Sequence, residues 1–94
     1  MTRRRFRLYV TERSPQAERL LADVSRAVVQ IAGAGEAEPE LVVVGERPQL
    51  VAEDGVVATP ALVVDDGERV RRAIGDVGNA EVLAHLLGAG RGRP

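Results

Sequence analysis

The chain has 94 residues, of which 45% are hydrophobic, and a formal net charge of −1. This length supports one small domain with one core, and the near-neutral charge argues against a protein that mainly coats nucleic acid. The absence of cysteine excludes disulfides, thiol nucleophiles and thiolate metal sites, and His85 is the only histidine. No apolar run approaches the ~20 residues of a membrane span, so we expect a soluble, cytoplasmic protein.

The first half of the chain predicts a β-α-β unit. Residues 5–10 alternate between apolar and other side chains, which predicts a strand with one buried face and one solvated face. Ser14 followed by Pro15 is typical of a helix start with Ser14 as the N-cap, and apolar residues then recur at three- and four-residue steps to Ile31. The apolar run 41–44 predicts a strand that is covered on both faces, as in a parallel sheet.

The second half predicts a short helix, a hairpin and a last helix. Pro48 opens the short helix, which runs to Asp54. Residues 61–64 predict a third strand, and the Asp-Asp-Gly turn that follows pairs it with a fourth strand over residues 68–74. Asn79 is the expected N-cap of the last helix.

The resulting order, β-α-β-α-β-β-α, is the thioredoxin-like arrangement of an α/β protein. We expect one domain over residues 1–94, with a core at about residues 5–88 and a flexible tail at residues 89–94. Pro60 stands just before the third strand, where thioredoxin-like proteins carry a cis proline. The sequence leaves a cis and an ordinary trans Thr59–Pro60 bond both open, because cis costs only about 0.5–1 kcal/mol before proline.

Four segments together resemble the KaiB family. Residues 48–62 combine a proline at a helix start, a Glu-Asp pair and an Ala-Thr-Pro run before a strand, which is similar to the KaiB signature. Residues 8–10 match the family's first strand, and residues 14–15 its helix start. Residues 71–76 are similar to its Arg-Arg-x-x-Gly-Asp segment. The matches follow one another in order along nearly the whole domain.

The resemblance implies a function in recognition. KaiB is a circadian-clock protein that binds the hexameric ATPase KaiC, and it switches between an oligomeric ground-state fold and a monomeric thioredoxin-like fold. The sensor domain of the clock kinase SasA resembles KaiB and stays thioredoxin-like. We therefore expect a non-catalytic module for circadian or related signalling, which binds a KaiC-like ATPase and needs no cofactor, metal or nucleic acid. A homo-oligomer remains open.

The same resemblance places partner contacts on the short helix, at Gln49, Glu53 and Asp54. The alternative interpretation of Glu53 and Asp54 is a solvated helix end. They do not form a catalytic carboxylate pair, because adjacent residues on a helix point in different directions. Ser14, as an N-cap hydroxyl, cannot replace the low-pKa thiol of a thioredoxin, so an oxidoreductase is not expected.

Three departures from KaiB bear on which family fold the chain adopts. A hairpin turn at residues 65–68 replaces the family's proline-rich stretch, and Val43 stands where KaiB has Asp. Residues 81–87 have helical patterning, whereas part of this region is a strand in the KaiB ground state. We expect KaiB-type fold switching, if it occurs, to favour the thioredoxin-like fold. A thioredoxin-like adaptor, or a stand-alone sensor domain without a KaiC partner, is the alternative function.

Overall fold

The computed structural model describes residues 4–36 and 38–88, so the predicted tail at 89–94 lies outside the described residues. The elements confirm the predicted order and the thioredoxin-like fold class. They are β1 (Arg5–Val10), α1 (Pro15–Ala32), β2 (Glu40–Val43), the 3-10 turn η1 (Val44–Glu46), α2 (Pro48–Asp54), β3 (Ala61–Asp65), β4 (Val70–Ile74) and α3 (Ala80–Leu87). Within the described ranges, no helix combines the length and apolar character that a membrane crossing requires.

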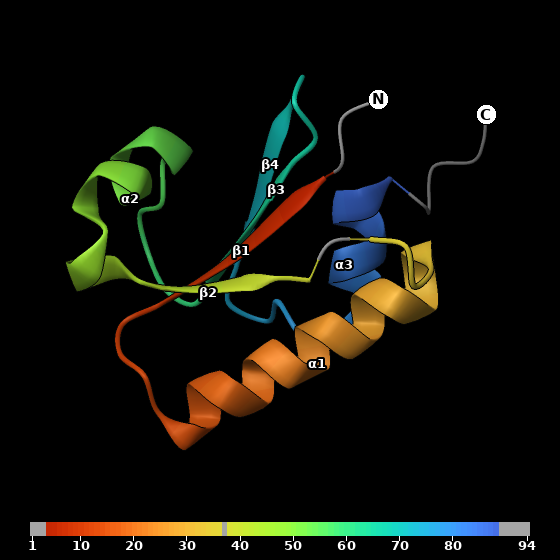
Figure 1. Cartoon of the computed structure of the whole chain (residues 1–94), viewed down its shortest axis with the longest axis horizontal. Helices are drawn as coiled ribbons and strands as arrows, with labels where there is room; N and C mark the ends of the chain where they lie inside the picture. The colour runs from red at the N-terminus through yellow and green to blue at the C-terminus, as the bar shows by residue number, and fades with distance from the viewer. Residues whose placement is uncertain (1–3, 37, 89–94) are drawn as a thin grey trace.

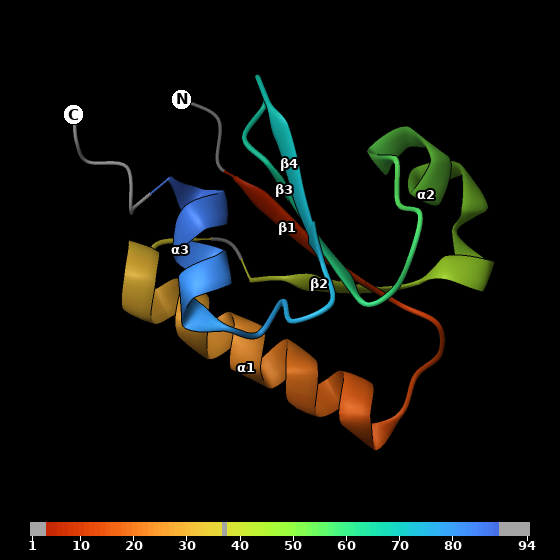
Figure 2. The same cartoon turned by 180° about the vertical axis from the view of Figure 1, so that it is seen from behind.

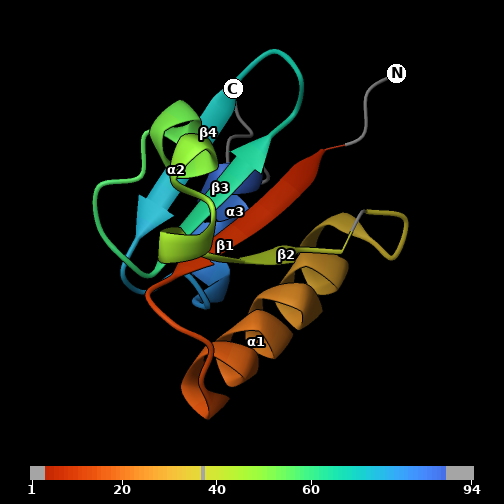
Figure 3. The same cartoon turned by 60° about the vertical axis from the view of Figure 1, so that its left-hand side comes forward.

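The four strands form one sheet in the order β2-β1-β3-β4 (Figure 1). β1 runs parallel to β2 and antiparallel to β3, and β3 runs antiparallel to β4. Helices α1 and α3 cover one face of the sheet, and α2 lies on the other (Figures 2 and 3). The sheet is therefore the middle of three layers, and β2 and β4 are its two edges.

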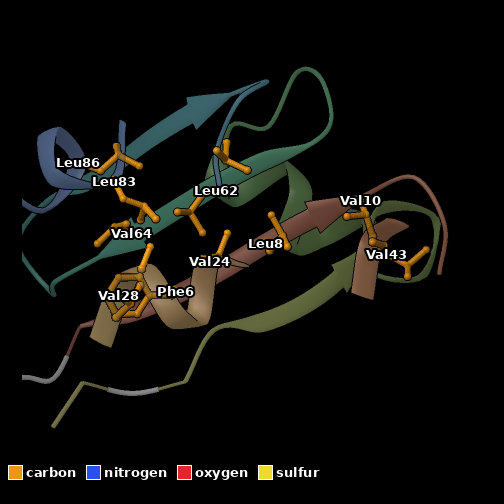
Figure 4. Packing of buried hydrophobic residues seen from close by; sticks show 13 residues of the cluster. Phe6, Leu8, Val10, Val24, Val28, Val43, Leu62, Val64, Leu83 and Leu86 are labelled. Carbon is orange, nitrogen blue, oxygen red and sulfur yellow. The ribbon is translucent and has the colours of Figure 1, made fainter. Parts of the chain in front are cut away.

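The main core lies between the sheet and the two helices α1 and α3 (Figure 4). Alternate residues of β1 and β3 point into it, as the period of two in a strand requires. The apolar stripe of α1 and the inner face of α3 pack against them. Its buried members include Phe6, Leu8, Val10, Val24, Val28, Leu62, Val64, Leu83 and Leu86.

A second, smaller core corrects the prediction of a solvated face on β1. Tyr9 is fully buried, and Arg7 is only 8% exposed. Both lie under α2, whose Leu50 and Val51 pack against a cluster that includes Tyr9 and Val63. The alternating pattern of β1 showed two unlike faces but could not show that a later helix covers the polar one.

The helix ends follow local sequence chemistry. The Ser14 hydroxyl accepts a hydrogen bond from the Ala17 N–H at 3.0 Å, which caps α1. The Asn79 side chain caps α3 by accepting from Glu81 N–H at 2.8 Å. Gly88 ends α3 with φ of 78°, a left-handed conformation that favours glycine. The expected helix at residues 81–87 is thus confirmed.

Candidate functional site

The outward face of α2 carries two of the predicted contact residues. Gln49 and Glu53 are both exposed, and they stand four residues apart, so they share one face of the helix. They border a shallow hollow of about 410 Å³. Its lining is Glu46, Arg47, Pro48, Gln49, Leu50 and Glu53. We call these six residues together the α2 surface.

Asp54, the third predicted contact residue, lies on the inner side of α2. Its side chain is 6% exposed and faces the sheet. Arg7 donates to it through two atoms, with Nε 2.7 Å from Oδ2 and Nη2 3.1 Å from Oδ1. The Tyr9 hydroxyl also donates to Oδ2. The interpretation of Asp54 as a solvated helix end is therefore wrong, and its carboxylate is not offered to a partner at the surface.

Opposing effects set the protonation of this cluster. Burial by itself would raise the pKa of Asp54, but the hydrogen bonds from Arg7 and Tyr9 and the charges of Arg7 and Arg72 lower it below 3.8 overall. The pKa of Arg7 is raised, chiefly by its hydrogen bond to Asp54. Burial, followed by the bond to Asp54, raises the pKa of the Tyr9 hydroxyl. The cluster therefore holds a carboxylate, a guanidinium and a neutral phenol at neutral pH.

The lowered pKa of Asp54 predicts a loss of stability in acid. Because the folded-state pKa lies below 3.8, the stabilisation is complete above the unfolded-state pKa and is lost as the pH falls through the folded value. We expect the urea midpoint to fall more steeply below about pH 4 in the natural chain than in Asp54→Asn. Circular dichroism between pH 7 and pH 2 measures this, and parallel profiles for the two chains would contradict it.

The adjacent arginines of β4 hold the carboxyl ends of two helices. Arg72 Nε donates to the main-chain oxygen of Asp54 at 2.7 Å, at the end of α2. Arg71, on the other face of the sheet, donates through Nη1 to the Leu86 oxygen of α3 at 3.1 Å. Cations are favourable at helix C-termini, where carbonyl groups lack partners. Gly55 ends α2 with φ of 67°, a left-handed conformation that favours glycine, and it lies beside the Arg72 guanidinium.

A pocket of about 280 Å³ brings together the three residues predicted to be structural. Ser14, Thr59 and Pro60 all line it, between the start of α1 and the start of β3. The Thr59–Pro60 peptide bond is cis. The Thr59 hydroxyl lies 2.7 Å from the hydroxyl of Thr11. This pocket offers hydroxyl groups where a thioredoxin would offer a thiol, and the chain contains no cysteine to supply one.

The structural role of Arg7 and Tyr9 was missed by sequence reasoning. One signal was available at Asp54: a carboxylate in the last turn of a helix is unfavourable next to the helix dipole and calls for a cation. That signal does not say which arginine supplies the charge. Arg7 is 47 positions away in sequence. Among the described residues, no group of three or more His, Cys, Asp or Glu side chains is placed to hold a metal ion.

Comparisons with known proteins agree with this architecture. The family model for the KaiB domain matches residues 7–89. The circadian clock protein KaiB3 of Synechocystis sp. is 32% identical over 88 residues, covering 94% of this chain and 83% of that protein.

Two solved structures share the fold. The N-terminal domain of Synechococcus elongatus SasA, solved in solution, has a TM-score of 0.76 at 23% identity, covering 99% of this chain and 90% of that one. A crystallised designed protein has a TM-score of 0.71 at 13% identity, covering 99% and 80%. At these identities the two likenesses show the fold alone. The family model and the KaiB3 match show more: this chain belongs to the KaiB family.

Proposed function

We propose that the chain is a non-catalytic interaction module that binds a KaiC-like ATPase in circadian or related signalling. The family match over residues 7–89 is the observation that carries this proposal. The relationship to KaiB3, a circadian clock protein, supports the signalling context. The chain's lack of cysteine supports recognition in place of thiol chemistry.

The α2 surface is the proposed docking site. Gln49 and Glu53 are exposed, and the hollow that they border also presents Leu50 and Pro48. On its inner side, α2 is fixed to the sheet by the buried contacts of Asp54. A helix held in this way needs little reordering when a partner binds, which lowers the entropic cost of association.

A pull-down with a KaiC-like hexamer, with and without ATP, tests the proposal. We expect retention of the natural chain and at least about tenfold weaker retention of the double variant Gln49→Ala/Glu53→Ala, a loss equivalent to about 1.4 kcal/mol. The matched control is Glu18→Ala/Gln30→Ala, which changes the same residue types at exposed positions of α1 on the opposite face of the sheet. The control should bind like the natural chain.

Two outcomes would count against the proposal. Equal losses in both double variants would remove the α2 surface as the docking site. Absence of a complex in every nucleotide state would favour the second candidate, a thioredoxin-like adaptor or a stand-alone sensor domain without a KaiC partner. The pocket beside Ser14 and the cis Thr59–Pro60 bond is the observation that favours this second candidate, because it is a recess with an apolar floor of Val10, Ala17 and Leu20.

The thioredoxin-like state is proposed to be the predominant one in solution. In that state α3 is capped at both ends, by Asn79 and Gly88, and its Leu83 and Leu86 are buried in the main core. A family fold with a strand in this region would give up those caps and that burial. Any fold switching therefore depends on the stability that these caps and this burial give to α3.

A further inference from the structure

Within residues 4–36 and 38–88, β4 pairs only with β3, so one side of its main chain forms an edge of the sheet. The β3–β4 ladder is flanked by bonds from Gly75 N–H to Pro60 O at 2.9 Å and from Asp66 N–H to Arg69 O at 3.1 Å. Hydrogen-bonded pairs alternate with non-bonded pairs in an antiparallel ladder. Arg71 and Ala73 therefore pair inward with β3. The N–H and C=O groups on either side of them, at Val70, Arg72 and Ile74, point outward.

The same three residues expose their side chains on the α2 face of the sheet. Val70 is 39% exposed and Ile74 is 49% exposed, and Arg72 stands between them. The apolar residues of α2 pack on β1, β2 and β3, so Val70 and Ile74 stay exposed beside that helix. On this face, a strand added beside β4 would lie next to an apolar, a basic and an apolar side chain, from Val70, Arg72 and Ile74.

On the opposite face, a groove of about 310 Å³ lies between β4 and α3. Its apolar lining comes from Ala73, Val82 and Leu86, and Glu81 and His85 also border it. In an added strand, the residue opposite Ala73 would direct its side chain toward this groove, because residues directly opposite in a ladder share a face. The edge thus has room for a side chain on each face.

Strand β4 carries two arginines, Arg71 and Arg72, and Arg69 directly precedes it. Within residues 4–36 and 38–88, Arg69, Arg71 and Arg72 form no ion pair with a carboxylate, whereas other arginines of the chain do. Two of the three acids of the neighbouring turn are already engaged, and the third, Glu68, is exposed. Asp65 contacts Arg7 and accepts from Gly67 N–H, and Asp66 accepts from the N–H groups of Glu68 and Arg69.

Charged side chains often protect an edge strand from pairing. Here the two central arginines are instead drawn back over the faces of the sheet, Arg71 toward α3 and Arg72 toward α2. Their remaining N–H groups stay available for acceptors, since a guanidinium has five donors. Pairing with a second copy centred on Arg72 would place two guanidinium groups opposite each other, which is unfavourable. An acidic strand is the complementary occupant.

We propose that the β4 edge binds an extended acidic segment of another protein by strand addition, in antiparallel register. The segment places apolar residues opposite Val70 and Ile74, acidic residues opposite Arg71 and Arg72, and an apolar residue opposite Ala73. Main-chain bonds supply affinity, and the alternating side chains supply selectivity. This surface is separate from the α2 surface and does not depend on binding of an ATPase.

The test uses a blocked peptide, acetyl-Thr-Val-Leu-Glu-Glu-Val-Thr-amide, titrated into the whole chain and followed by NMR. We expect shifts and slowed exchange at the outward amides of Val70, Arg72 and Ile74, with no change at the other sheet edge, β2. The matched peptide with both Glu replaced by Lys should bind at least about fivefold more weakly, because attractive cross-strand pairs become repulsive. Equal binding of the two peptides, no binding of either, or shifts centred on β2 would overturn the proposal.

Three variants check the strand-addition geometry. Ile74→Pro removes an outward N–H without removing a bond to β3, and it should abolish acidic-peptide binding. Ile74→Ala keeps that N–H and should retain most of the binding. Ile74→Glu needs no change in the backbone and should weaken binding by repulsion even if the proline variant folds poorly. Two results would overturn the acidic partner and indicate another occupant. They are undiminished peptide binding in Ile74→Glu, and shifts at the β4 edge that grow with protein concentration in the absence of peptide.

Discussion

Asp54→Ala is expected to lower the free energy of unfolding by about 3 kcal/mol, because it leaves a buried cation without its partner. The Arg7 side chain is 9% exposed and donates two hydrogen bonds to the Asp54 carboxylate. After the substitution only Asp65, at 3.4 Å, remains as an anionic contact. The Tyr9 hydroxyl loses its acceptor on Asp54 as well. Chemical and thermal unfolding followed by circular dichroism measure the effect, and the melting temperature should fall by roughly 12–20 °C for a domain of this size.

The adjacent residue provides the control for this prediction. Glu53→Ala removes an exposed carboxylate from the same helix, so its effect should stay within about 0.5 kcal/mol. The double variant Arg7→Met/Asp54→Ala removes both charges and should be less destabilised than the sum of the two single variants. Simple additivity in that cycle would mean that the two side chains do not stabilise the fold as a pair.

Because Asp54 holds the inner side of α2 against the sheet, the Asp54→Ala substitution should also weaken the proposed ATPase binding. Asp54→Ala replaces no residue of the α2 surface, so any loss of binding would indicate that the helix has moved. Tyr9→Phe removes one donor to the carboxylate and retains the ion pair with Arg7, and it should retain more of the binding than Asp54→Ala. Gln49→Ala/Glu53→Ala could abolish binding while Asp54→Ala binds normally. That result would support the α2 surface as the docking site and contradict the positioning role of Asp54.

Leu83→Ala is expected to cost about 2–4 kcal/mol, because it opens a cavity where α3 meets the main core. Leu83 is fully buried, and α3 packs against both α1 and β4. The loss falls on a helix whose region is expected to be partly a strand in a KaiB-type ground-state fold. The expected result is therefore a drop in stability together with a selective loss of α3 signals, while β1 and α1 keep theirs. Denaturant unfolding and hydrogen exchange by NMR measure the two effects.

His85→Ala is the matched control, since His85 is exposed on the same helix. It should leave both stability and the exchange pattern of α3 within about 0.5 kcal/mol of the natural chain. A Leu83→Ala variant in which residues 81–87 exchange as in the natural chain would show that burial of α3 does not maintain the fold state. Strand-type signals in those residues would show that the second family fold lies close in free energy.

Much of this fold follows from short-range chemistry in the sequence. The caps at Ser14 and Asn79, the turn at residues 65–68 and the helical patterning of residues 81–87 each involve residues only a few positions apart. Such interactions form in nearly the same way whatever surrounds them. For this reason the sequence alone predicts the element order and, through it, the fold.

Small boundary differences mark where local patterning stops being sufficient. The apolar run 41–44 predicts strand through Val44, but Val44 begins η1, and the fourth strand starts at Val70 and not at residue 68. At Val44 the chain turns toward α2, and before Val70 it is still part of the hairpin turn. Strand ends depend on the length of the neighbouring strand, which the local sequence does not contain.

The sequence by itself determined the absence of thiol chemistry, the order of elements and the resemblance to KaiB. Only the tertiary structure decided the role of Asp54. The adjacent Glu53 is exposed, yet the docking of α2 turns Asp54 toward an arginine 47 positions earlier. Burial and ion pairing are properties of contacts between distant segments. For that reason the local sequence did not distinguish the exposed Glu53 from the buried, ion-paired Asp54.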